Sequence, residues 1–165
     1  MPTIHATCIT WSGCGLLIRG ASGAGKSRLA HFLINRAPLF GIEACLVGDD
    51  RIAIDRRGDA LFARVPEAIA GLLEVRGVGL IRLPHVQEAR LGLVIDILPK
   101  EEIPRLPRPE DLCTPLEGVS LPRCFSASVE GTLDIILTLC GHAGGTLEEQ
   151  SALASVTFDG KTKRP

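Results

Sequence analysis

The chain has 165 residues, of which 45% are hydrophobic and 22% charged, and its formal net charge is −1. This composition is typical of one ordinary globular domain. The nearly neutral charge gives no basic surface for nucleic acid or an anionic membrane, and aromatic residues, at 4%, are too few for base stacking. No segment approaches the roughly 20 apolar residues of a membrane span. We therefore expect no nucleic-acid and no membrane partner.

Short apolar runs bounded by turn residues predict strands along the first two thirds of the chain. They cover residues 4–9, 15–18, 44–47, 51–55, 60–65, 80–83 and 91–98. The runs 51–55 and 60–65 predict a hairpin around Arg57-Gly58-Asp59.

Helical patterns are fewer. Residues 27–36 predict a helix because Leu29, Phe32 and Leu33 recur at helical spacing, and residues 129–140 predict a second one before Gly141. Between them, residues 99–122 hold six of the eleven prolines and predict a long loop.

The six cysteines have irregular spacing and no C-x-x-C pair, which indicates neither a zinc site nor a redox motif. We expect mostly buried, reduced thiols. The N-terminus lacks the charged and apolar regions of a secretory signal, so we expect a cytoplasmic protein.

One segment matches the phosphate-binding pattern G-x-x-x-x-G-K-[ST] at every fixed position. It consists of Gly20, Ala21, Ser22, Gly23, Ala24, Gly25, Lys26 and Ser27. Glycines let backbone N–H groups converge on phosphate oxygens, and the start of the following helix adds partial positive charge. Lys26 would reach the terminal phosphates and Ser27 would bind Mg²⁺. The alternative is a glycine-rich turn without a ligand. We favour ATP with Mg²⁺.

Acidic residues follow the strand at 44–47. Asp49 and Asp50 stand where ligands of nucleotide-binding sheets are held, so one carboxylate could bind Mg²⁺ while the other accepts a proton from an attacking hydroxyl. The alternative is an acidic turn that opens the hairpin. Beside the phosphate-binding pattern, the functional interpretation is favoured.

Two weaker candidates remain. Glu74 and Arg76 flank glycines and could bind metal and phosphoryl charge, or form a surface ion pair at a turn. His5, taken alone, is an exposed strand histidine.

These features, in this order, resemble the HPr kinase/phosphorylase family. The similarity covers His5-Ala6-Thr7, the loop 20–27, residues 46–51 (LVGDDR) and residues 71–81 (GLLEVRGVGLI), and it weakens after residue 98. The resemblance implies an α/β fold, a P-loop-containing mixed sheet with few helices, like the nucleotide-binding core of phosphoenolpyruvate carboxykinase. It implies a cytoplasmic ATP- and Mg²⁺-dependent kinase that phosphorylates a serine of HPr, the phosphocarrier of the bacterial phosphotransferase system. It further implies a homo-oligomer, typically a hexamer.

The resemblance also implies roles for individual residues. Asp50 would be the catalytic base, His5 the active-site histidine and Lys26 the phosphate contact. Ser27, Asp49 and Glu74 would bind the metal, and Arg105 matches a catalytic loop arginine.

The chain departs from longer family members at two points. It has no room for their N-terminal domain before His5, so we expect a short form with a catalytic domain at residues 1–145 and a flexible tail at 146–165. Residues 121–124 (LPRC) lack a late Pro-Gly-Arg-Asn-like element, which counts against the reverse phosphorylase reaction and against a hexamer. Two rival functions are a small-molecule P-loop kinase and a non-catalytic ATP-binding regulatory module.

Overall fold

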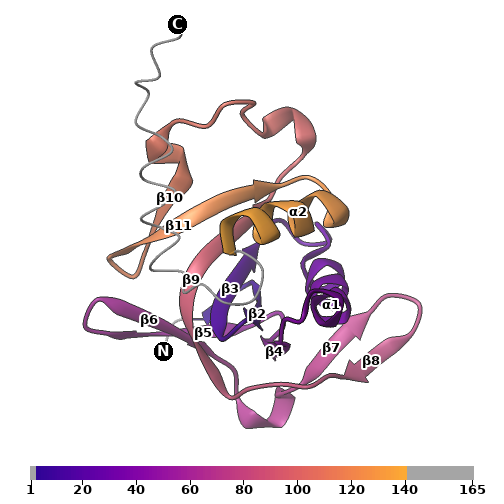
Figure 1. The fold of residues 1–165 in the computed structure, drawn as a ribbon. Helices are drawn as coiled ribbons and strands as arrows, with labels where there is room; N and C mark the ends of the chain where they lie inside the picture. The colour runs from indigo at the N-terminus through magenta and orange to yellow at the C-terminus, as the bar shows by residue number, and fades with distance from the viewer. Residues whose placement is uncertain (1–2, 141–165) are drawn as a thin grey trace, which may run out of the picture.

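A computed structural model describes residues 3–140 of the chain (Figure 1). Within these residues the chain forms eleven strands, two α-helices and four short 3₁₀ helices. The α-helices are α1 (Lys26–Arg36) and α2 (Val129–Cys140). The strands are β1 (Thr3–Ile4), β2 (Thr7–Trp11), β3 (Cys14–Arg19), β4 (Ala44–Gly48), β5 (Ile52–Arg57), β6 (Ala60–Arg64), β7 (Leu72–Val75), β8 (Gly79–Arg82), β9 (Glu88–Ile97), β10 (Cys113–Leu116) and β11 (Val119–Ser126). The 3₁₀ helices are Ala37–Phe40, Glu67–Ile69, Lys100–Glu102 and Pro109–Leu112. This is the mixed α/β fold with few helices that the sequence predicts.

A nine-stranded sheet carries most of the fold. Its main order is β1-β5-β6-β9-β3-β2-β4, and β11 joins it beside β9 with β10 at its own edge. Hairpin β7–β8 forms a separate two-stranded sheet. The long strand β9 pairs with β6 through residues 88–90 and with β3 and β11 further on.

The direction of the central strands decides which strand ends lie at the same edge of the sheet. Strands β3, β9 and β11 are parallel to one another. Strand β2 is antiparallel to both β3 and β4, so β4 runs in the direction of β3. The carboxyl ends of β3, β4, β9 and β11 therefore lie at the same edge as the amino end of β2.

Each face of the sheet packs against its own core because successive strand residues point to opposite faces. On one face, Ile18 and Leu46 pack with Leu29 and Leu33 of α1 and with Ile136 of α2. The neighbouring Leu17 and Val47 point to the other face, where the curled hairpin β5–β6 covers them with Ile52, Ile54 and Leu61. Figure 1 shows both helices on one side of the central strands and the β5–β6 hairpin on the other.

Two sequence predictions need correction. The expected strand 4–9 is broken by a bend at His5, between β1 and β2. The expected loop 99–122 is a loop only as far as Leu112, because β10 and the first half of β11 form a hairpin in which Cys113 pairs with Pro122. Pro115 is tolerated there because β10 is an edge strand, where a missing N–H breaks no second ladder. The predicted boundary at residue 145 and the tail 146–165 lie outside the described residues.

The cysteines are free, as the sequence predicts, and all but Cys113 are at least partly buried. Burial raises the pKa of Cys14 and of Cys124 to about 12, so these thiols stay protonated and are poor nucleophiles.

No helix among residues 3–140 is long and apolar enough to cross a membrane.

A buried carboxylate joins three strands at the edge described above. Asp96 of β9 is 6% exposed. Its Oδ1 accepts a hydrogen bond from Arg19 Nε of β3 at 2.7 Å, and its Oδ2 lies 2.8 Å from Arg19 Nη2 and 2.6 Å from Arg123 Nε of β11. Arg19 Nη2 also donates to Thr114 Oγ1 of β10 at 3.3 Å. We call Arg19, Asp96 and Arg123 the Asp96 cluster.

We expect Asp96→Asn to lower the free energy of unfolding by about 3 kcal/mol, the low end of the range for breaking a buried ion pair, because the two guanidinium groups left without a counter-charge are only partly buried. Urea denaturation followed by circular dichroism measures this change. The matched control is Asp134→Asn on the exposed face of α2, for which we expect a change within about 0.5 kcal/mol. Equal effects of the two variants would show that the cluster does not stabilise the sheet.

Candidate active site

The glycine loop, residues 20–27, connects β3 to α1 and ends in a helix start that no side chain caps. Gly25 is the N-cap, with φ 97° and ψ 21°, a left-handed conformation that favours glycine. The first hydrogen bond of the helix runs from the Leu29 N–H to the Gly25 carbonyl at 2.8 Å. The N–H groups of Lys26 and Ser27 precede that bond and have no helical partner. Together with the partial positive charge of the helix end, they can hold an anion.

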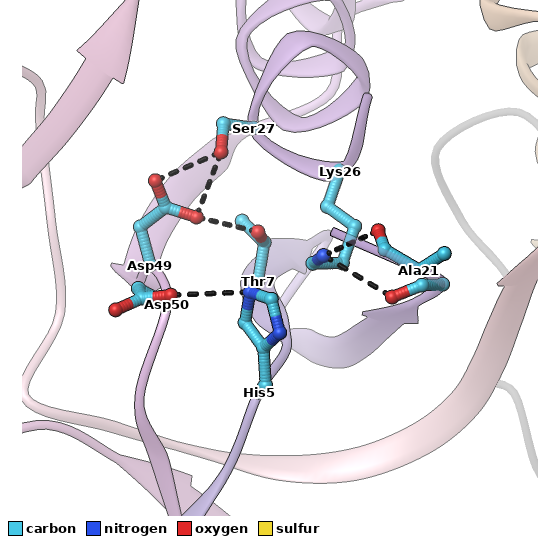
Figure 2. A network of polar contacts seen from close by, with 8 residues as sticks. His5, Thr7, Ala21, Lys26, Ser27, Asp49 and Asp50 are labelled. Atoms are coloured by element: carbon cyan, nitrogen blue, oxygen red, sulfur yellow. Dashed lines mark hydrogen bonds and ion pairs between the residues drawn. The ribbon is translucent and has the colours of Figure 1, made fainter. Parts of the chain in front are cut away.

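Lys26 is held beneath this loop. Its side chain is buried, with the residue 6% exposed, and its Nζ donates to the carbonyl oxygens of Gly20 at 3.2 Å and Ala21 at 3.0 Å. An ammonium group has three donors, so one more remains for a phosphate oxygen. Figure 2 shows Lys26 turned toward Ala21, while the neighbouring Ser27 points toward Asp49.

Asp49 connects the glycine loop to the sheet. Ser27 Oγ donates to its two carboxylate oxygens at 3.0 and 2.9 Å, and Thr7 Oγ1 donates to its Oδ1 at 2.5 Å (Figure 2). The carboxylate after β4 is thereby fixed by α1 and by the first residue of β2. A serine hydroxyl beside a carboxylate is an oxygen donor set of the kind that Mg²⁺ prefers, so these residues fit the metal that the sequence predicts.

Asp50 lies beside His5. Their Oδ1 and Nε2 atoms are 3.1 Å apart, and the side chains of Asp50 and His5 are 73% and 51% exposed, so both are accessible from solvent. Asp50 has φ 67°, a left-handed conformation that costs a non-glycine residue of the order of 1–3 kcal/mol. This turn directs the two adjacent carboxylates to different partners, Asp49 to the loop serine and Asp50 to His5.

The structure thus brings together five residues: His5, Thr7, Ser27, Asp49 and Asp50. Thr7 had no predicted role. Its only signal in the sequence is a hydroxyl at the first position of a strand, where the structure buries it completely.

Glu74 and Arg105 lie on other elements. Glu74 is exposed on β7 of the separate hairpin, and Arg105 is exposed in the loop between β9 and β10. Residues 3–140 contain no group of three or more His, Cys, Asp or Glu side chains placed to hold a metal. The metal role of Glu74 and the catalytic role of Arg105 therefore stay predictions.

Comparison with known proteins relates the chain to one group of enzymes. A family model described as the HPr serine kinase C-terminal domain matches residues 1–92, which include every predicted site residue except Arg105. The HPr kinase/phosphorylase of Mycoplasma pneumoniae is 36% identical over 106 residues, which are 60% of this chain and 32% of that protein. That of Geobacillus thermodenitrificans is 35% identical over 134 residues, 73% of this chain and 40% of that protein.

The chain therefore spans about a third of the length of the curated relatives it matches, 32% for the first of them. Among solved structures, the Hpr(Ser) kinase/phosphatase from Coxiella burnetii has the same fold. Its TM-score is 0.70 at 24% identity, and the match covers 94% of this chain and 99% of that one.

We expect Lys26→Met to weaken binding of inorganic tripolyphosphate by about 10- to 100-fold, since charge-assisted hydrogen bonds contribute about 1.5–3 kcal/mol each. Isothermal titration calorimetry in the presence of Mg²⁺ measures the dissociation constant. Arg56→Met, which removes an exposed guanidinium at the turn end of hairpin β5–β6, away from the loop, is the control and should leave it unchanged. Equal weakening by both variants would mean that only the overall charge matters.

Proposed function

We propose a phosphotransfer function on the premise that the chain belongs to the HPr serine kinase C-terminal domain family, whose model matches residues 1–92. The proposed reaction moves the γ-phosphoryl group of ATP to a serine of an HPr-type phosphocarrier protein. One observation carries the proposal: an uncapped helix start, the Ser27–Asp49 pair and the exposed His5–Asp50 pair lie at one edge of the sheet. The groups that would bind phosphate and the group that would accept a proton are thereby adjacent.

The binding part of the reaction falls to the glycine loop. Lys26 and the free N–H groups at the start of α1 would hold the β- and γ-phosphates. Ser27 and Asp49 would hold Mg²⁺, which when bound neutralises phosphate charge. Because Thr7 and Ser27 fix the Asp49 carboxylate in advance, little reorganisation is needed for binding. Kinship with the phosphoenolpyruvate carboxykinase core is part of the same proposal.

Asp50 would act on the acceptor. Its carboxylate is exposed, so a serine on the surface of another protein can reach it. Asp50 would accept the hydrogen bond of the serine hydroxyl, orient its oxygen toward the γ-phosphorus and take the proton as the bond forms. His5, 3.1 Å from Asp50, would hold that carboxylate in its strained position.

A labelling experiment separates this function from its two rivals. The protein is incubated with γ-labelled ATP, Mg²⁺ and purified HPr-like carriers, and the products are resolved by gel and by mass spectrometry. Label on a carrier serine supports the proposal. Label on a small metabolite supports a small-molecule kinase, and ATP binding without turnover supports a regulatory module.

Three finer points belong to the same proposal. The free cysteines fit a reducing compartment such as the bacterial cytoplasm. Val78 and Leu80 on hairpin β7–β8 are 72% and 70% exposed, which supports a homo-oligomer that covers them.

The kinase direction is proposed without the reverse phosphorylase reaction, because residues 121–124 lack the Pro-Gly-Arg-Asn-like element that is tied to that reaction. Adding inorganic phosphate to the serine-phosphorylated carrier tests that last point.

We expect Asp50→Asn to keep ATP binding but to lower the rate of transfer by about 10²- to 10⁴-fold, the usual contribution of a general base. Rapid-quench measurement of labelled carrier gives the rate, and calorimetry gives the affinity for ATP. Asp59→Asn, in the exposed turn of hairpin β5–β6, is the matched control and should transfer at the wild-type rate. Wild-type transfer by Asp50→Asn would remove Asp50 from the mechanism.

A further inference from the structure

Thr7, the first residue of β2, is a completely buried polar residue beside the candidate site. Its Oγ1 donates to Asp49 Oδ1 at 2.5 Å. Within residues 3–140 this hydroxyl has no other hydrogen-bond partner, so its one polar contact is with a carboxylate that the metal site would use. Figure 2 shows Thr7 and Ser27 reaching that carboxylate from different sides.

A β-bulge in β4 sets the position of Asp49 relative to β2. Ile9 pairs with Leu46, but Cys8 pairs with Gly48, so the register shifts by one residue between them. Val47 is the extra residue on β4. Bulges of this kind redirect side chains and are frequent next to active sites.

The shift decides which residue of β2 stands opposite Asp49. In the register that β4 has before the bulge, Asp49 would lie opposite Ala6, whose methyl group cannot donate a hydrogen bond. After the bulge, the position opposite Asp49 belongs to Thr7. Thr7 also pairs with Ile18 of β3, which packs against α1, so its side chain lies on the same face of the sheet as Ser27.

The two oxygens of the Asp49 carboxylate have different surroundings. Oδ1 accepts from Thr7 at 2.5 Å and lies 3.0 Å from Ser27 Oγ, whereas Oδ2 lies 2.9 Å from Ser27 Oγ alone. Each carboxylate oxygen has about two acceptor sites, and a serine hydroxyl has a single proton to give. Oδ1 is therefore the occupied oxygen, and Oδ2 keeps an open position.

We propose that Thr7 is a positioning residue for the divalent cation, an inference that rests on the proposed function. By holding Oδ1, Thr7 turns Oδ2 of Asp49 to the side of Ser27 Oγ, so that these two oxygens form the ligand pair. Thr7 itself would not touch the cation. Hydrogen-bond partners of metal ligands typically contribute 10- to 100-fold to metal affinity, because they fix the ligand before the metal arrives.

Three variants separate this role from a general effect on the fold. Thr7→Val replaces the hydroxyl by a methyl group of similar shape, and Thr7→Ser keeps the hydroxyl. The matched control is Thr10→Val in the same strand. Thr10 is 8% exposed, and its Oγ1 accepts a hydrogen bond from the Cys45 N–H at 3.0 Å, so the control also removes a buried hydroxyl that joins β2 to β4.

The measurement is binding of inorganic tripolyphosphate to the full chain by calorimetry, once with EDTA and once with saturating Mg²⁺. We expect Thr7→Val to keep the wild-type affinity in EDTA and to lose about 10- to 100-fold with Mg²⁺. Thr7→Ser should stay within about three-fold of wild type under both conditions, and Thr10→Val should change neither affinity. Thermal melts followed by circular dichroism verify that the variants are folded.

Each result supports or contradicts the role of Thr7. Wild-type affinity with Mg²⁺ in a folded Thr7→Val, or the same loss in Thr10→Val, would overturn it. Equal weakening in EDTA and in Mg²⁺ would also overturn it, because the change would then act on the glycine loop. A wild-type chain that binds tripolyphosphate no more tightly with Mg²⁺ than with EDTA would refute the proposed metal site itself, and the positioning role with it.

Discussion

The site depends on the direction of five neighbouring strands. Strands β3, β4, β9 and β11 end at one edge of the sheet, where β2 begins. Short loops at this edge can therefore bring together residues that are distant in the chain: Thr7 and Ser27 are 42 and 22 positions from Asp49, yet both donate to its carboxylate. Ligands of open α/β sheets bind outside the carboxyl ends of strands, and here four such ends converge.

The Asp96 cluster stabilises that edge from within the sheet. Arg19 is the last residue of β3 and directly precedes the glycine loop, so its pairing with Asp96 fixes the point from which the loop departs. Arg123 ties β11 to the same carboxylate and thereby places the turn that leads into α2. Two guanidinium groups around one carboxylate leave a net positive charge at the base of the loop, which favours an anion above it.

The sequence alone was sufficient to predict those parts of the site that consecutive residues form. The glycine loop was predicted from eight consecutive residues, and the helix after it from the spacing of Leu29, Phe32 and Leu33. The β5–β6 hairpin was predicted from the turn at Gly58. Ser27 and Asp49 were each predicted as metal ligands, but the hydrogen bonds between them were not predicted. His5 was expected inside a continuous strand, but its chain bends there, and the bend leaves His5 beside Asp50. No local pattern signals such a bend, because it depends on β1 pairing with β5 instead of continuing into β2.

The remaining errors and open predictions have the same origin, which is non-local pairing. Pro115 disfavours a strand by propensity, and the place of β10 at the sheet edge makes it tolerable. Strand β9 was recognised as apolar, but its insertion between β6 and β3 could not be inferred from its residues. That insertion places Ile97 and the start of α2 on one side of the glycine loop. It leaves β2 and β4, with Asp49 and Asp50 after β4, on the other side. The order of the strands, which no local pattern reveals, therefore decides which side chains lie on each side of the glycine loop.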